Sequence, residues 1–205
     1  MQHEYRTLKL PVKLETREDG KPRIEGYAAV FYRADDPGTE YKIYDDIVER
    51  VMPTAFTEHF SAARDCKALF NHDAGCLLGR EGNRTLTLSV DQIGLRYSID
   101  PPDTQLGRDM VAYLARGDIS GSSFAFRVTG QTWKEVGSML YRQIDSVELF
   151  DVGPVTYPAY EATTAGLRSR DLDAIRKEAD VWRKANRPRP SLAHRRRQLR
   201  LVEAE

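Results

Sequence analysis

A short turn near the middle of the chain carries three serines among two glycines, over Gly117-Asp118-Ile119-Ser120-Gly121-Ser122-Ser123. It joins a segment of helical periodicity to the strand-like Phe124-Ala125-Phe126. The glycines permit backbone angles that other residues resist, and the alternating phenylalanines fix the strand in a core, so a serine here is held rigidly. Rigid placement is what a nucleophilic hydroxyl needs. The alternative is a structural Ser/Gly loop that caps the strand.

One of the four histidines is the candidate base for such a serine. His72 ends an apolar run inside a predicted sheet, whereas the other three lie at the N-terminus, in a short predicted helix and in a basic tail. A neutral imidazole is the usual acceptor of a serine proton. Asp73 and Asp151 are candidates to orient the imidazole. A histidine with a purely structural role is the alternative interpretation.

Short strands with alternating apolar residues surround these candidates. Such close spacing of short strands indicates an antiparallel sheet or barrel. A change to helical periodicity predicts a helix over 104–116, with Thr104 as its cap and Gly117 as its stop. The strands are expected over residues 4–14, 23–32, 67–73, 77–80, 85–90, 94–100, 124–128, 133–136, 139–144 and 147–152, and further helices over 54–64, 170–185 and 191–203.

Composition describes one globular domain with an appended tail. The 205 residues are 40% hydrophobic and 30% charged, which suffices for one domain of about 150 residues and a small second unit. No apolar run approaches the ~18 residues of a membrane span, and the first residues lack the apolar part of a signal peptide, so we expect a cytoplasmic protein without membrane contact. Cys66 and Cys76 lack zinc-ligand spacing, and we expect both to be reduced. The sequence predicts no metal and no organic cofactor.

The zero net charge conceals an asymmetry between body and tail. Residues 166–205 carry 12 Lys and Arg against 6 Asp and Glu, a charge of +6, whereas residues 1–165 carry 19 against 25, a charge of −6. We therefore predict a domain over 1–165 and a helical basic tail over 166–205 that either contacts an acidic partner or is simply solvated. Nucleic acid is not the expected partner, because the arginines of the tail have only Trp182 beside them for base stacking.

Several motifs, taken together and in order, resemble the prohead (capsid maturation) serine proteases of tailed bacteriophages. They cover roughly residues 20–165. The matching segments are Gly26-Tyr27-Ala28-Ala29-Val30-Phe31, Pro53-Thr54-Ala55-Phe56, Leu69-Phe70-Asn71-His72-Asp73 with Leu78-Gly79-Arg80, Thr85-Leu86-Thr87-Leu88 with Gly94-Leu95, Gly117 to Phe126, and Leu149 to Tyr160.

The resemblance implies a fold and a set of catalytic residues. The fold is α+β and mainly β: a closed antiparallel β-barrel with a few packed helices, related to the herpesvirus assembly proteases. His72 matches the family's base, Ser123 its nucleophile and Asp151 its acidic third residue. Ser122 is a rival nucleophile, because Ala125 replaces the family's usual glycine and Ser122 itself stands where the family usually has a larger apolar residue. Glu148 and Asp73 are rivals for the third position, because Gly153-Pro154 replaces the usual Ser-Leu.

The resemblance also implies a function. It is that of a serine endopeptidase that cleaves scaffold or capsid-protein segments, and itself, during phage head maturation. The place of action is the inside of immature proheads in the bacterial cytoplasm, with the major capsid protein and scaffold segments as substrates and self-association left open. The alternative is a catalytically inactive assembly or scaffolding module, from which cleavage of the capsid protein would distinguish it.

Overall fold

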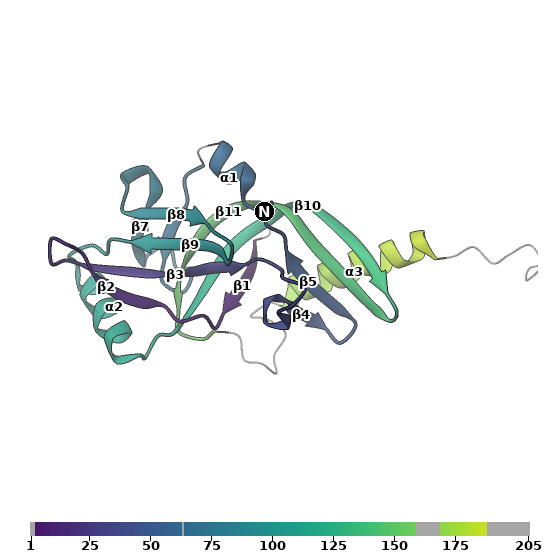
Figure 1. The fold of residues 1–205 in the computed structure, drawn as a ribbon, viewed down its shortest axis with the longest axis horizontal. Helices are drawn as coiled ribbons and strands as arrows, with labels where there is room; N and C mark the ends of the chain where they lie inside the picture. Colours follow the sequence, from purple (N-terminus) through teal and green to yellow (C-terminus); the bar gives the residue numbers. More distant parts are fainter. Residues whose placement is uncertain (1–2, 63, 159–168, 188–205) are drawn as a thin grey trace, which may run out of the picture. The chain divides into compact units, whose positions relative to one another are not determined.

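The computed structural model describes residues 3–62, 64–158 and 169–187, and its strands dominate the described chain (Figure 1). By its internal contacts the chain divides into a unit over Met1–Leu172 and a second over Asp173–Glu205. The strands are β1 Glu4–Leu8, β2 Lys13–Thr16, β3 Pro22–Val30, β4 Tyr41–Tyr44, β5 Ile47–Val51, β6 Lys67–Leu69, β7 Leu77–Arg80, β8 Leu86–Val90, β9 Gly94–Ile99, β10 Gly121–Val136 and β11 Met139–Val155. The α-helices are α1 Thr57–Ser61, α2 Gln105–Arg116 and α3 Ser169–Asn186, with short 3-10 turns at Pro37–Thr39 and Glu81–Asn83.

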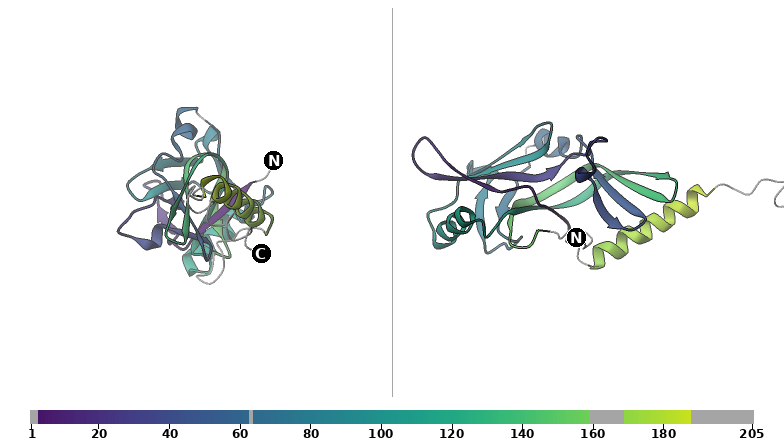
Figure 2. Two further views of the ribbon diagram at one scale, coloured as in Figure 1. Left: turned by 90° about the vertical axis from the view of Figure 1, so that its right-hand side faces the viewer. Right: turned by 60° about the horizontal axis from the view of Figure 1, so that its bottom comes forward.

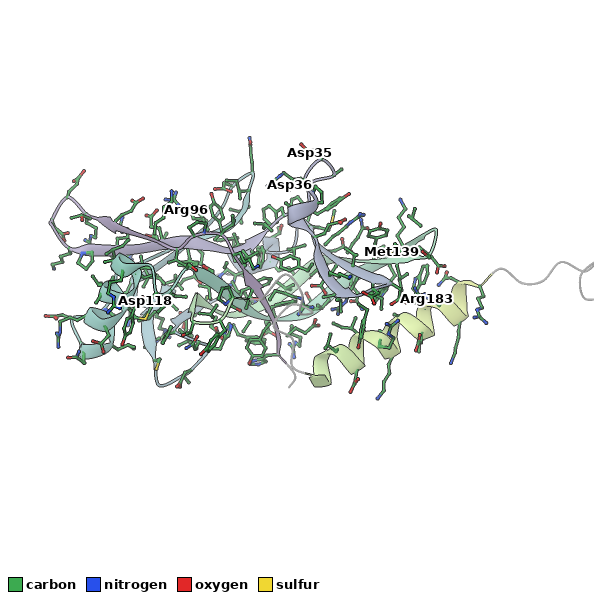
Figure 3. All side chains as sticks on the ribbon, turned by 90° about the horizontal axis from the view of Figure 1, so that it is seen from below. Asp35, Asp36, Arg96, Asp118, Met139 and Arg183 are labelled. Carbon is green, nitrogen blue, oxygen red and sulfur yellow. The ribbon has the colours of Figure 1, made fainter. Side chains whose placement is uncertain are left out.

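Two sheets make up the first unit. The larger has the order β1-β10-β11-β5-β4, with β6 on β11 and β7 on β6, and the smaller has the order β2-β3-β9-β8. The long hairpin of β10 and β11 lies inside the larger sheet, with β1 on one side and β5 and β6 on the other (Figure 1). Asp118, just before β10, and Met139, at the start of β11, lie toward opposite ends of this hairpin (Figure 3).

The expected closed antiparallel barrel is wrong. A barrel closes only when its edge strands pair with each other, and among the described residues no ladder joins the two sheets. The free edge of β11 is filled by two successive strands, β5 along Leu140–Ile144 and β6 along Asp151–Val152, which do not pair with each other. Both of these pairings are parallel, so the larger sheet is mixed rather than antiparallel. The fold is mainly β, with two open sheets.

Several element boundaries also differ from those expected. The strand predicted over 4–14 is divided: β1 joins the larger sheet and β2 the smaller, with the exposed Leu10 and Pro11 between them. The helix predicted over 54–64 is shorter in the structure, where α1 spans only Thr57–Ser61. The strands predicted over 124–128, 133–136, 139–144 and 147–152 belong to one bulged hairpin, β10–β11.

The prediction for α2 is confirmed. Thr104 caps it by accepting a hydrogen bond from the Gly107 amide, and it stops at Gly117, whose φ of 78° suits glycine. α2 contacts β2 of the smaller sheet (Figure 2). Among the described residues, no helix is both long and apolar enough to cross a membrane. The expected helix over 191–203 and the boundary at residue 165 lie outside the described residues.

Aromatic side chains of β10 form the centre of the core. Phe124 and Phe126 are buried, with their rings stacked at 4.7 Å between centroids, and Phe56 meets Phe124 edge-on at 5.9 Å. Each such buried ring removes a large apolar surface from water. This packing fixes the part of β10 that carries the serines.

A buried group of four charges ties β1 to β5 and β11. Arg6 donates to both carboxylate oxygens of Glu49, from Nε at 2.6 Å and from Nη2 at 2.7 Å. Arg142 donates through Nη1 to Glu49 at 2.9 Å and to Glu4 at 2.8 Å, and Glu4 also accepts from Arg6 at 2.7 Å. Because Arg6 and Glu49 are fully buried, removal of either would leave three buried charges that no longer balance, at a cost of about 3–5 kcal/mol.

Glu4 should make folding stability depend on pH in the acid range. Burial raises the pKa of its carboxyl, but the charges and hydrogen bonds of Arg6 and Arg142 outweigh burial and lower the pKa from 4.5 to about 2. A carboxyl with a lowered pKa contributes stability above its unfolded value and loses it as the pH falls toward the folded value. At pH 6 we expect the free energy of unfolding of wild type to be higher than that of Glu4→Gln by up to about 3 kcal/mol. This difference should shrink as the pH falls from 4.5 to 2.

Urea titrations of both proteins at several pH values measure this difference. The comparison with Glu4→Gln cancels the titration of the carboxylates that do not share Arg6 and Arg142 with Glu4. A difference that stayed constant between pH 6 and pH 2.5 would contradict the assignment.

Candidate active site

Ser122 and Ser123 lie inside β10, and their hydroxyls have different partners. Successive residues of a strand point to opposite faces of the sheet. Ser122 Oγ lies 2.7 Å from the Tyr97 hydroxyl of β9 in the smaller sheet. Ser123 Oγ lies 2.7 Å from Nε2 of His72. Only Ser123 therefore lies within hydrogen-bond reach of a base.

His72 reaches Ser123 from the loop that follows β6. Its backbone is left-handed, with φ of 58°, and so is that of Asn71, with φ of 54°. The loop is closed at its base by the Phe70 amide, which donates to the Cys76 carbonyl at 3.0 Å. The second ring nitrogen, Nδ1, lies 2.5 Å from Oδ1 of Asp151. The imidazole thus bridges a hydroxyl and a carboxylate.

Asp151 lies on the same face of the larger sheet as Ser123, directly beside a β-bulge. Asp151 lies opposite Ala125 in the ladder, and the next pair is Phe126 with Leu149, so Phe150 is the extra residue of β11. Bulges are frequent beside active sites. Because Ala125 is two residues after Ser123, Asp151 shares the face of the Ser123 side chain.

Gly153 lets β6 lie close to β11, so that His72, in the loop after β6, comes within reach of Ser123. Gly153 lies opposite Ser123 in the ladder. A Cβ atom on Gly153 would lie only 2.1 Å from the Leu69 carbonyl oxygen, at the end of β6. A serine would not fit at this position without displacing β6. Glycine in place of the serine of the family's usual Ser-Leu therefore makes room for β6 beside β11.

The Ser123 hydroxyl has a second neighbour, the backbone carbonyl of Arg6, at 2.8 Å. The hydroxyl has one proton, and a carbonyl can only accept it. When the proton points to the Arg6 carbonyl, Nε2 of His72 must be the donor to Ser123 Oγ. When the proton points to His72, the imidazole is neutral, with Nδ1–H donating to Asp151. The second arrangement is the one that can deprotonate the hydroxyl.

The rival residues lie in less suitable surroundings. Burial raises the pKa of Tyr97 despite its hydrogen bond with Ser122, so the partner of Ser122 is a neutral phenol rather than a base. Asp73 accepts the Gly75 amide within its own loop, at 2.8 Å, and no hydrogen bond joins it to His72. Glu148 forms ion pairs with Arg64 and Arg127. Ser123, His72 and Asp151 are the candidates that the structure brings together.

Access to Ser123 is restricted in the substrate-free structure. Ser123 is fully buried, and the side chains of His72 and Asp151 are 15% and 11% exposed. A cavity of about 520 Å³ lies between α2 and the turn joining β2 to β3, and none of the three residues lines it. Within the described ranges no three His, Cys, Asp or Glu side chains gather as a metal site would require. Burial raises the pKa of the Cys66 thiol, so Cys66 is a poor nucleophile.

Sequence reasoning missed several residues that shape this site. The Arg6 carbonyl leaves no trace in a sequence, because any residue supplies a carbonyl. Glu49 does leave one, since it is a charge within the apolar segment Ile47–Val51. Asn71 also leaves one, because asparagine tolerates the left-handed region better than most residues.

A hydroxyl, an imidazole and a carboxylate joined in this order define the class of serine hydrolases that work by acyl transfer. The family model of the caudovirus prohead serine proteases matches residues 9–178, so the chain belongs to that family. No curated protein and no solved structure shows a significant match to the chain.

Proposed function

We propose that the chain is a serine endopeptidase of phage head maturation, with Ser123 as nucleophile, His72 as general base and Asp151 as the carboxylate that orients the imidazole. The observation that carries the proposal is the pair of hydrogen bonds on His72, at 2.7 Å to Ser123 and 2.5 Å to Asp151. Family membership supports the reaction class.

The proposed reaction is a two-step acyl transfer. His72 Nε2 takes the Ser123 proton as Oγ attacks a peptide carbonyl carbon, and Asp151 stabilises the imidazolium that results. His72 then gives that proton to the departing amine, which leaves an acyl ester on Ser123. Water, deprotonated by His72, hydrolyses the ester and restores the hydroxyl. Because Ser123 is buried, a local opening must precede the attack.

The substrates proposed are segments of the major capsid protein and of the scaffold, together with the chain itself. Prohead proteases act within the assembling head, so these are the polypeptides that surround the enzyme. The site of action would be the immature prohead in the host cytoplasm.

Co-expression with the major capsid protein of the same phage tests this function. We expect a shortened capsid protein with one or a few defined new termini, mapped by mass spectrometry, and their loss in the presence of a serine-directed phosphonate. An intact capsid protein beside an intact chain would instead favour an assembly module without turnover.

The basic tail should be separable from the protease fold. We propose that residues 166–205 contact an acidic partner in the prohead, since their charge of +6 opposes the −6 of the preceding residues. Deleting them should leave the urea midpoint of the remaining domain nearly unchanged and reduce the amount of protease packaged into proheads.

A second truncation, after residue 178, controls for the helix, because the family match extends to that residue. If the chain folds when cut after 178 but not when cut after 165, the domain includes the first half of α3. The proposed division at residue 165 would then be wrong.

A further inference from the structure

The backbone is left-handed at two consecutive residues where the candidate base leaves β6. Among the described residues only three other than glycine have a positive φ, and two of them are Asn71 and His72. Side chains disfavour this region, and asparagine tolerates it better than histidine does. Such a conformation persists only when the surrounding contacts hold it. The contacts of Asn71 are therefore the place to look for what holds His72.

Asn71 is fastened to the end of β11 by three hydrogen bonds. Its amide donates to the Pro154 carbonyl at 3.1 Å. Its Nδ2 donates to Thr156 Oγ1 at 3.0 Å, and its Oδ1 accepts from the Thr156 amide at 2.9 Å. A backbone N–H can only donate, so the last of these bonds fixes which end of the Asn71 side chain is oxygen.

The strand that holds Asn71 is the one that carries Asp151. Both Pro154 and Asp151 belong to β11, which pairs with β10 at Ser123. The three hydrogen bonds of Asn71, which we call the Asn71 clamp, therefore fix the backbone beside His72 relative to Asp151 and Ser123, the two partners of the imidazole. The Tyr5 ring also contacts the imidazole edge-on, at 4.6 Å between centroids.

We propose that Asn71, acting with Thr156, is a positioning residue that holds His72 in register with Asp151 and Ser123. The proposal deepens the proposed protease function and rests on it for the kinetic readout. Asn71 takes no part in proton transfer. It acts by keeping the loop left-handed, so that the ring nitrogens stay within hydrogen-bond distance of a carboxylate and a hydroxyl.

The kinetic test uses a peptide that spans a mapped cleavage site and the full chain. We expect Asn71→Ala to lower kcat about 10- to 100-fold with less than a threefold change in KM, because misplacing a base by a fraction of an ångström costs rate rather than binding. Asn71→Asp should stay within about threefold of wild type, since a carboxylate still accepts the Thr156 amide and hydroxyl protons.

Thr156 provides a matched pair that does not endanger the fold, because its side chain is exposed. Thr156→Val removes the hydroxyl contact and should lower kcat several-fold, whereas Thr156→Ser keeps it and should match wild type. Equal kcat in Asn71→Ala, Thr156→Val and wild type would overturn the proposal.

A spectroscopic readout separates this proposal from the protease function itself. The Nδ1–H of His72, bonded to Asp151, should give a far-downfield proton resonance that is absent in His72→Ala. We expect the resonance to weaken or vanish in Asn71→Ala and to return in Asn71→Asp. If wild type cleaved nothing, the protease function would fail while this resonance still decided the role of Asn71. An unchanged resonance in Asn71→Ala would show that the clamp does not position the ring.

Discussion

Replacing Ser123 with alanine is expected to lower peptide hydrolysis by at least about three orders of magnitude, the cost of losing the nucleophile of a serine protease. Ser123 is the serine whose hydroxyl lies 2.7 Å from His72 Nε2. The variant should fold as wild type does, because only one buried hydroxyl is lost. Initial rates on the mapped cleavage peptide, with the urea midpoint as a check on folding, measure the effect.

Ser122→Ala is the matched control for this prediction. Ser122 is equally buried and differs in its partner, the neutral hydroxyl of Tyr97. We expect a modest loss of stability, about 1–3 kcal/mol if the Tyr97 hydroxyl is left unpaired, and a rate within about tenfold of wild type. Full activity in Ser123→Ala with none in Ser122→Ala would transfer the nucleophile to Ser122.

Asp151→Asn is expected to lower the rate by about 10³- to 10⁴-fold near neutral pH. The asparagine amide can donate to Nδ1 and so favours the tautomer with its proton on Nε2. In that tautomer His72 cannot accept the Ser123 proton. The size of the side chain is unchanged, so the loss should fall on kcat. The measurement is kcat and KM over a range of pH.

Two further carboxylates test whether the effect is specific to Asp151. Asp73→Asn and Glu148→Gln make the same change of charge near the site, but neither residue contacts His72 through a hydrogen bond among the described contacts. Both should stay within about threefold of wild type. A larger loss in either than in Asp151→Asn would reassign the third residue.

Local features of the fold could be predicted because their causes are local in the sequence. The helix α2 follows from a capping threonine, a 3.6-residue apolar period and a stop glycine, all within fourteen residues. The proximity of His72 and Ser123, 51 residues apart, was expected from the resemblance to the family, and the structure places them 2.7 Å apart. Alternation along β10 predicted that Ser122 and Ser123 would face different partners.

The rest depends on pairings between distant segments, which the sequence does not encode locally. Nothing in the sequences of β5 or β6 shows that both lie parallel to β11, which makes the larger sheet mixed rather than antiparallel. The charges of Arg6 and Arg142 have the sequence pattern of solvated surface residues, and only the assembled fold shows that Glu49 pairs with both in the interior. The place of Asp151 opposite Ala125, on the face of Ser123, likewise appears only once β10 and β11 are paired.

Covalent labelling with a small fluorophosphonate tests the central claim most directly, because this reagent reacts with a serine that a neighbouring base activates. Peptide mapping by mass spectrometry of the labelled full chain should place one adduct on Ser123. The adduct should be absent in Ser123→Ala and greatly reduced in His72→Ala, while Ser122→Ala is still labelled. An adduct on Ser122, or labelling of Ser123 that is as fast without His72 as with it, would contradict the assignment of Ser123 and His72 as nucleophile and base.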